Sequence, residues 1–178
     1  MVKQAMIFAA GMGKRMLPLT ETTPKPLVKI NDKTILDLKI EQYQYQGFTN
    51  FIFCVGYKGE LIRKSIDEKS GIHAEFSDAG EKAGILSRIF HAKQIIGDQV
   101  LMTYGDTYTD IDLCELIFSH QKSGNEVTIV TAPIENPFGL VEFNHENKVT
   151  FFKEKPILNY FIGYAMINKS ALDLVPQK

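Results

Sequence analysis

Apolar runs alternate along this chain with segments in which apolar residues recur every three or four positions. The runs predict strands at 2–8, 51–55, 72–76, 100–104, 127–132 and 161–167. The other segments predict helices from Thr34 to near Gly47 and at 59–69, 83–96 and 112–121, with a short helix after Lys169. Strands that alternate with helices are typical of an α/β protein with a largely parallel sheet.

The pattern changes after residue 139. Apolar segments at 140–143 and 149–152 flank the polar turn 144–147, which predicts a β-hairpin. A chain of 178 residues can bury a substantial core, and no internal repeat or long linker divides it. We therefore predict an α/β fold: a Rossmann-like, mostly parallel sheet flanked by helices, with a small β-hairpin extension, in one domain over residues 1–178.

Two end signals bound the first long helix. Thr34 can cap its start, with Asp37 three residues further on as a capping partner. Gly47 is a natural stop, because glycine readily takes the left-handed conformation that ends many helices.

The turn after the first strand combines glycines with cations. It contains Ala10, Gly11, Gly13, Lys14 and Arg15, and Lys25 follows nearby. Glycine lets backbone N–H groups approach an anion closely, and cations neutralise the charge of that anion. This turn therefore predicts a phosphate site. An ordinary Gly-rich turn with solvated cations is the alternative.

Two common phosphate loops do not fit this turn. A P-loop needs four residues between its glycines, followed by Gly-Lys-Ser or Gly-Lys-Thr. A dinucleotide fingerprint needs a third glycine where Met16 stands, and Pro18 would interrupt the helix that should begin here.

The wider pattern resembles a known family. Residues 11–20 read Gly-x-Gly-x-Arg-x-x-Pro-x-Thr and are followed by Pro-Lys-Pro at 24–26, which is similar to the signature of the sugar-1-phosphate nucleotidyltransferases. These enzymes join a nucleoside triphosphate to a sugar 1-phosphate and release pyrophosphate. The resemblance implies catalytic roles for Arg15 and Lys25. It implies nucleotide binding by Ala10, Gly11, Gly13 and Lys14.

A carboxylate follows the strand at 100–104. Asp106 comes directly after Gly105, at the strand end where ligands of open α/β sheets bind. Mg²⁺ is usually bound through one or two carboxylates, water and substrate phosphates. The segment 104–110 is similar to the Gly-Asp segment of the family, whose Asp carries the metal, so we expect Asp106 to hold Mg²⁺. A turn or cap role is the alternative, and Asp110 and Asp112 are weaker candidates.

Two further segments follow in the order of the family. Residues 152–156 are similar to its Glu-Lys-Pro element, which implies that Lys155 reaches the sugar phosphate and that Glu154 lies near the sugar. A solvated strand end is the alternative. The segment 81–86 stands where the family has a Gly-rich turn against the base, which implies a nucleotide contact at Gly84; a simple helix start is equally compatible. Residues 56–60 resemble the glucose-1-phosphate cytidylyltransferase branch.

The resemblance covers essentially the whole chain, with two departures. Family members usually continue for several dozen residues and supply a second metal-binding Asp, whereas this sequence ends at Lys178. Either the chain is truncated at its C-terminus or a short member completes its site differently. Residues 161–164 read Phe-Ile-Gly-Tyr where many relatives have Asn-x-Gly for sugar contact. The sugar and the base therefore stay open.

Composition and charge limit the classes of molecule that this protein is expected to bind. The net charge is −1 and no basic block is present, which argues against extended binding of nucleic acid. We expect no membrane association, because we find neither a signal peptide nor an apolar run of spanning length. Cys54 and Cys114 are interpreted as buried thiols of a cytoplasmic protein. The expected partners are a nucleoside triphosphate and a sugar 1-phosphate, and the oligomeric state is open.

Three other functions stay open. A binding module could keep the phosphate loop, lack the second carboxylate and bind triphosphate without turnover. A cytidylyltransferase acting on a non-sugar phosphate such as phosphocholine is compatible with the departure at Phe161. A nicotinamide-dependent oxidoreductase is the least favoured, because the third glycine is missing and no acidic ribose partner is evident.

Overall fold

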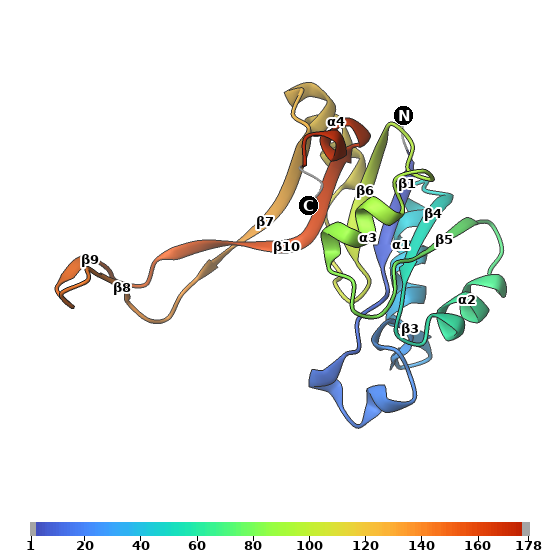
Figure 1. The fold of residues 1–178 in the computed structure, drawn as a ribbon, viewed down its shortest axis with the longest axis horizontal. Helices are drawn as coiled ribbons and strands as arrows, with labels where there is room; N and C mark the ends of the chain where they lie inside the picture. Colours follow the sequence, from blue (N-terminus) through green and yellow to red (C-terminus); the bar gives the residue numbers. More distant parts are fainter. Residues whose placement is uncertain (1–2, 176–178) are drawn as a thin grey trace. The chain divides into compact units, whose positions relative to one another are not determined.

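The central sheet has six strands in the order β5-β4-β1-β6-β10-β7 (Figure 1). In this computed structural model, which describes residues 3–175, they are β1 (Gln4–Phe8), β4 (Asn50–Val55), β5 (His73–Asp78), β6 (Gln99–Tyr104), β7 (Val127–Glu135) and β10 (Ile157–Asn168). Strand β1 pairs in parallel with β4 and β6, and β4 pairs in parallel with β5. Strand β10 runs antiparallel to β6. The predicted mostly parallel α/β sheet is confirmed.

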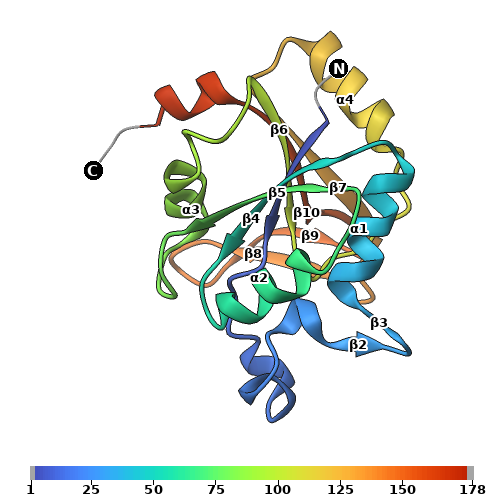
Figure 2. The ribbon, with the colours of Figure 1, turned by 90° about the vertical axis from the view of Figure 1, so that its right-hand side faces the viewer.

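Four α-helices accompany the sheet within the described residues: α1 (Ile35–Tyr45), α2 (Gly59–Asp67), α3 (Ile85–His91) and α4 (Leu113–Ser123). The 3₁₀ helices are η1 (Lys14–Met16), η2 (Leu19–Glu21), η3 (Lys25–Leu27) and η4 (Lys169–Asp173). Two strands, β2 (Lys29–Ile30) and β3 (Lys33–Thr34), form a small antiparallel pair. Helices α1 and α3 lie on opposite faces of the sheet (Figure 2). None of the described helices has the length and apolar character needed to cross a membrane.

The described chain divides into two compact units. The first comprises the residues up to Thr128 and from Gly163 onward, and the second comprises Ile129–Ile162. The second unit contains the antiparallel pair β8 (Leu140–Phe143) and β9 (Val149–Lys153), which confirms the predicted hairpin. The expectation of a single domain stays a prediction.

Both end signals of α1 are confirmed. The Thr34 hydroxyl accepts a hydrogen bond from the Asp37 backbone N–H at 3.0 Å, and the Asp37 carboxylate accepts one from the Thr34 N–H at 2.8 Å. This reciprocal pair satisfies donors that the first helical turn leaves free. Gly47 has φ +83°, the left-handed conformation expected just after the helix.

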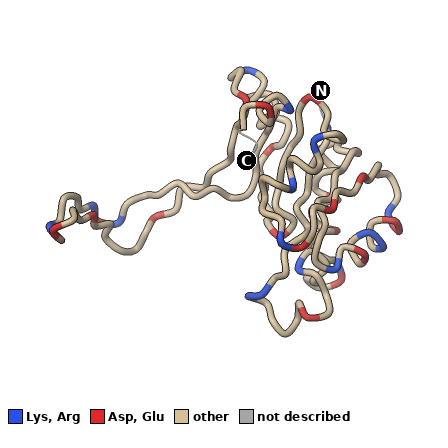
Figure 3. The backbone as a smooth tube through the Cα atoms, viewed as in Figure 1, with Lys and Arg blue, Asp and Glu red and all other residues tan. Residues whose placement is uncertain are grey.

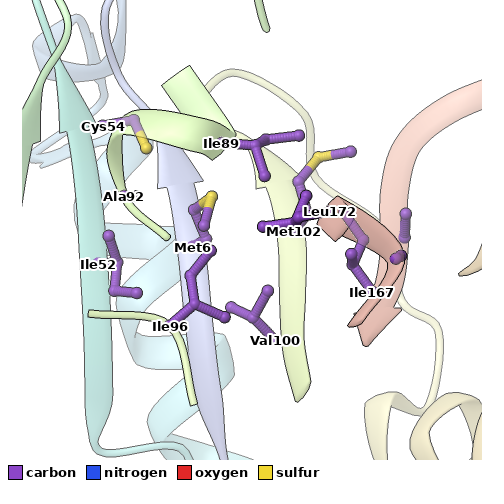
Figure 4. Close-up of a cluster of buried hydrophobic side chains, with 12 residues drawn as sticks. Met6, Ile52, Cys54, Ile89, Ala92, Ile96, Val100, Met102, Ile167 and Leu172 are labelled. Carbon is purple, nitrogen blue, oxygen red and sulfur yellow. The ribbon is translucent and has the colours of Figure 1, made fainter. Parts of the chain in front are cut away.

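Strand β4 shows why its sequence is apolar throughout. Phe51 stacks on Tyr43 of α1 with ring centroids 6.2 Å apart, so this side of the strand faces α1. The alternate residues point to the other face, where they join a cluster that includes residues of α3 and η4 (Figure 4). Its members are Met6, Ile52, Cys54, Ile89, Ala92, Ile96, Val100, Met102, Ala165, Ile167, Ala171 and Leu172. Burial on both faces requires the continuous apolar run.

Two element bounds differ clearly from the prediction. Helix α3 ends at His91, although the apolar spacing continues to Ile96. Ala92 and Ile96 are buried in the turn after the helix, so the spacing reports burial and not continued helix. Strand β10 begins at Ile157, four residues before the predicted start at 161. The prediction missed these residues because they are mostly exposed and carry no strand-period pattern. The predicted first strand began at residue 2, which lies outside the described residues; β1 begins at Gln4.

Charged residues are mixed in sign along the described backbone (Figure 3). Lys and Arg positions lie among Asp and Glu positions on the helices, the strand ends and the loops. This mixture agrees with the net charge of −1 and gives no support for an extended nucleic-acid surface.

Gly105, the residue after β6, lies close to the last residue of β1, and its substitution tests this packing. A Cβ atom at residue 105 would lie 2.6 Å from the backbone oxygen of Phe8. We expect Gly105→Ala to lower the free energy of unfolding by about 1–3 kcal/mol, as overpacking does. Gly97→Ala is the control, because its nearest contact would be 3.5 Å away. Equal urea midpoints for the two variants would contradict this account.

Candidate functional site

A pocket of about 450 Å³ lies beside Phe8 and Tyr104, the last residues of β1 and β6. Loops that follow neighbouring strands form its walls, as expected at the carboxyl edge of a parallel sheet. Its lining includes the predicted site residues Ala10, Gly11, Gly13, Lys14, Arg15, Lys25, Gly84 and Asp106. The structure thus brings these residues together, and the role of each stays a prediction.

The loop after β1 is held by short backbone and side-chain contacts. The Ala9 N–H donates to the Cys54 oxygen at 2.8 Å, which continues the pairing of β1 with β4. Gly13 has φ +63°, and a Cβ atom there would lie 2.8 Å from Thr20 Cγ2. Its backbone oxygen accepts bonds from the Met16 N–H at 2.8 Å and the Thr20 hydroxyl at 3.0 Å. Residue 13 must therefore be glycine for this loop to close.

Two other glycines of the pocket are not required by packing. A Cβ atom at Gly11 or Gly84 would meet no other atom of the protein within 4 Å. Both residues nevertheless line the pocket. Glycine at these positions leaves backbone accessible and leaves space that a ligand can occupy.

The charge of the pocket favours an anion. The side chains of Lys14 and Arg15 are exposed at the start of η1. Lys25 Nζ lies 2.5 Å from Asp106 Oδ2, and their side chains are 26 % and 30 % exposed. Arg88 and Glu81 are the other charged residues of the lining. Cations therefore outnumber carboxylates, which creates a positive potential suited to phosphate groups.

Sequence reasoning missed Arg88. This buried side chain donates to the backbone oxygens of Val55 at 2.8 Å, Gly80 at 2.7 Å and Ala83 at 3.1 Å. It therefore fastens the segment before α3, which forms one wall of the pocket, to the end of β4. Its position beside Ile89 on the buried face of the predicted helix is the feature of the sequence that could have indicated a buried arginine.

Lys39 of α1 was also missed. Its side chain is fully buried, and Nζ donates to the Thr107 oxygen at 2.6 Å and to the Tyr164 hydroxyl at 2.8 Å. Burial lowers the pKa of Lys39 to about 7, and the negative charge of Asp106 opposes this shift. Helical spacing puts Lys39 on the buried face of α1 with Leu36 and Tyr43, and that spacing was the available signal.

Asp106 is the predicted ligand of a divalent cation in the pocket, and Glu81 is the other carboxylate of the lining. Within residues 3–175, no group of three or more His, Cys, Asp or Glu side chains forms a metal cage. The lining instead holds two carboxylates, Asp106 and Glu81, among four cationic side chains, which fits Mg²⁺ bound mainly by substrate phosphates and water. Asp112 instead caps α4, accepting bonds from the N–H groups of Cys114 and Glu115.

Glu154 and Lys155 belong to the second unit. They are exposed at the turn between β9 and β10, and Lys155 has φ +40°. They are not among the lining residues of the pocket in the first unit. Their contact with a sugar phosphate stays a prediction.

The comparison with protein families is decisive for the class of protein. The family described as "Nucleotidyl transferase" matches residues 4–167. The chain belongs to this family. The resemblance to sugar-1-phosphate nucleotidyltransferases expected from the motifs is confirmed.

Two curated relatives are similar to this nucleotidyl transferase. A mannose-1-phosphate guanyltransferase of Hypocrea jecorina is 32% identical over 170 residues, which cover 90% of this chain and 46% of the relative. A probable glucose-1-phosphate cytidylyltransferase of Bacillus subtilis is 30% identical over 199 residues, which cover 98% of this chain and 78% of the relative. The chain thus spans about half the length of the guanyltransferase.

A solved structure shares the fold of this nucleotidyl transferase. HddC from Yersinia pseudotuberculosis superposes with a TM-score of 0.75 at 22% identity, covering 99% of this chain and 81% of that chain. The shared architecture therefore extends over both units of the chain.

The buried amine of Lys39 makes stability depend on pH. Its pKa is about 7 when folded and 10.5 in the absence of burial, so the unfolded chain binds more protons between these values. The free energy of unfolding should therefore rise with pH across this window. We expect the free energy of unfolding of the wild type minus that of Lys39→Met to increase from pH 7 to pH 9. Urea unfolding at each pH measures both values.

Lys33→Met is the control, because Lys33 is exposed and pairs with Glu41 on the surface. Burial raises the pKa of the neighbouring Tyr43 and Tyr164, so both stay neutral in this range. If the free energy of unfolding of the wild type minus that of Lys39→Met stays constant or falls with rising pH, the buried amine is not the cause of the pH dependence.

Proposed function

We propose that this chain forms the nucleotide-binding part of an enzyme that makes a nucleoside diphosphate sugar. The reactants are a nucleoside triphosphate and a sugar 1-phosphate, and the second product is pyrophosphate. The observation that carries the proposal is the gathering of Lys14, Arg15, Lys25 and Asp106 in one pocket at the end of β1 and β6. Family membership supports the reaction class.

In the proposed reaction, an oxygen of the sugar phosphate attacks the α-phosphorus of the triphosphate. The new phosphorus–oxygen bond forms as the bond to the β-phosphate oxygen breaks, and pyrophosphate leaves with that electron pair. The attacking phosphate is already ionised at neutral pH, so the reaction requires no general base. The work of the protein is to position the reactants and to neutralise charge.

The cations of the pocket divide this work. Arg15 can make forked contacts with phosphate oxygens, which suits the leaving β- and γ-phosphates. Lys25 is a compact point charge that we assign to the α-phosphate, and Lys14 adds charge at the same loop. Backbone at Gly11, Gly13 and Gly84 leaves room for the nucleotide.

Mg²⁺ is the proposed cofactor, with Asp106 as its protein ligand. When bound, the ion supplies positive charge to phosphate oxygens. In the structure, the same carboxylate pairs with Lys25. Lys25 and Asp106 therefore lie in direct contact within the pocket lining.

The sugar phosphate is assigned to the second unit. Lys155 would neutralise it and Glu154 would accept hydrogen bonds from sugar hydroxyls, as the resemblance implies. Exposure of both side chains leaves them accessible to a substrate. Sugar and base are left to experiment.

Loss of a pocket charge tests the proposed turnover. We expect Arg15→Ala and Asp106→Asn to slow pyrophosphate release by about 10²–10³-fold, as deletion of a preorganised charge does. The assay is a panel of triphosphates against several sugar 1-phosphates, with phosphocholine as a non-sugar acceptor. Lys29→Ala and Asp32→Asn are controls, since both residues are exposed and outside the pocket lining.

Three outcomes separate the candidate functions. Near-normal release by Arg15→Ala or Asp106→Asn would refute the assignment of the site. Binding of triphosphate without any release by the wild type would favour a binding module. Release only with phosphocholine would identify the non-sugar cytidylyltransferase.

Lys155 has a test of its own. Lys155→Ala should raise the KM for the sugar phosphate by about tenfold or more, because a charge-assisted contact of about 1.5–3 kcal/mol is lost. The KM for the triphosphate should stay within about twofold, since a surface substitution changes energies by roughly 0.5 kcal/mol at most. Lys148→Ala is the matched control, as Lys148 is also exposed in the second unit. Equal effects on both substrates would contradict the assignment.

A further inference from the structure

Two side chains of α1 and that of Gln46, the residue that caps its C-terminal end, bind the segment that follows Asp106. Lys39 donates to the Thr107 oxygen at 2.6 Å, Gln42 Nε2 donates to the Thr109 oxygen, and Gln46 Nε2 donates to the Ile111 oxygen at 3.3 Å. The donors lie three and four residues apart, so they share one face of the helix. The acceptors are every second residue of the segment. We call this set of three bonds the α1 ladder.

The ladder divides the segment 106–112 into two edges. The residues that accept its bonds are partly buried, and the residues between them are exposed, which is the alternation of an extended chain. Asp106, Tyr108 and Asp110 lie on the exposed edge. The helix thus holds one edge of the segment and leaves the edge with Asp106 and Asp110 exposed.

Lys39 is the costly member of the ladder. A fully buried ammonium group loses its hydration. This loss is offset here by two hydrogen bonds and by the rings of Tyr164 and Tyr43, whose centroids lie 4.5 Å and 5.4 Å from Nζ. The Tyr164 hydroxyl also donates to the Thr107 oxygen at 3.2 Å, so two donors meet at this one carbonyl. An apolar side chain would fill the position at lower cost, which indicates that the bond to Thr107 is the reason for a lysine.

Gln42 gives a second indication that α1 is built to bind this segment. Its Oε1 atom is buried and has no hydrogen-bond partner among residues 3–175. An unpaired buried oxygen is unfavourable. The bond from the Nε2 atom of this amide to the Thr109 oxygen is therefore the reason for a glutamine at residue 42.

We propose that the α1 ladder positions Asp106 for its role in the pocket, with Lys39 as the principal positioning residue. On the other side, the Gly105 N–H donates to the Phe8 oxygen at 2.9 Å. Asp106 thus stands between two anchors: β1 holds the residue before it, and α1 holds the residue after it. The consequence for Mg²⁺ rests on the proposed function, whereas the anchoring of the segment does not.

Proteolysis measures the anchoring without any substrate. Tyr108 is 62% exposed, and chymotrypsin can cleave after it only when the segment leaves α1. Lys39→Met and Gln42→Leu should each speed this cleavage by about tenfold, the change expected for one lost hydrogen bond in a local opening equilibrium. Mass spectrometry follows the fragment that ends at Tyr108.

Matched controls lie on the same stretch of chain. Lys33→Met removes an exposed lysine that pairs with Glu41. Gln44→Leu removes a glutamine of α1 that reaches the oxygens of Ser70 and Gly71 instead. Neither control should change cleavage after Tyr108. Unchanged cleavage in the two ladder variants would overturn the proposal, and Gln42→Leu decides the matter if Lys39→Met fails to fold.

Metal binding then tests the consequence for Asp106. Substitutions that disorient a metal ligand typically cost about 10–100-fold in affinity or activity. We expect that loss for Mn²⁺ binding to Lys39→Met, followed by electron paramagnetic resonance of the free ion. The affinity for inorganic tripolyphosphate in metal-free buffer should hardly change. An equal loss of both affinities would indicate general loosening and overturn the positioning role.

The two proposals fail in different ways. If the wild type releases no pyrophosphate with any substrate pair, the proposed function fails, yet cleavage and Mn²⁺ binding still decide the role of the ladder. If pyrophosphate release proceeds normally and the ladder variants match the wild type in cleavage and Mn²⁺ affinity, the ladder proposal alone fails.

Discussion

The parallel pairing of β1 with both β4 and β6 is the constraint on which the rest of the first unit depends. Phe8 is in register with Cys54 on one side and with Tyr104 on the other, so the three strands end at one level. The loops that leave these strands must therefore meet at the same edge. The close approach of Gly105 to Phe8 keeps this edge tight. The pocket is a direct result of that alignment.

Buried charge serves the walls of the pocket and not the stability of the core. Arg88 and Lys39 are both buried on helices that cover opposite faces of the sheet, and both donate to backbone oxygens of loops at the carboxyl edge. Bonds to these backbone carbonyls offset part of the hydration that each side chain loses on burial. The two helices thus hold these loops from behind, while the glycine loop and Asp106 line the pocket.

Part of the site could be predicted, and the rest could not. Asp106 was predicted from its place after a strand and Gly105, and Arg15 from the glycine turn and the family resemblance, all of which are local to the sequence. The structure places both residues in the lining of the pocket. Arg88 and Lys39 stand inside helices among apolar residues, so their partners are set by which loop each helix packs against. The bound of α3 was missed for a related reason: Ala92 and Ile96 are buried without being helical.

The sequence by itself determined the order of elements, the two-sided burial of β4, the cap of α1 at Thr34 and the glycines and cations of the loop after β1. These features depend on residue types a few positions apart, whose physical effects are local. Only the tertiary structure decided that Lys25 meets Asp106 across 81 positions and that α1 holds the segment behind Asp106. Such contacts arise when strand pairing brings distant loops to one edge, and no local pattern encodes that distance.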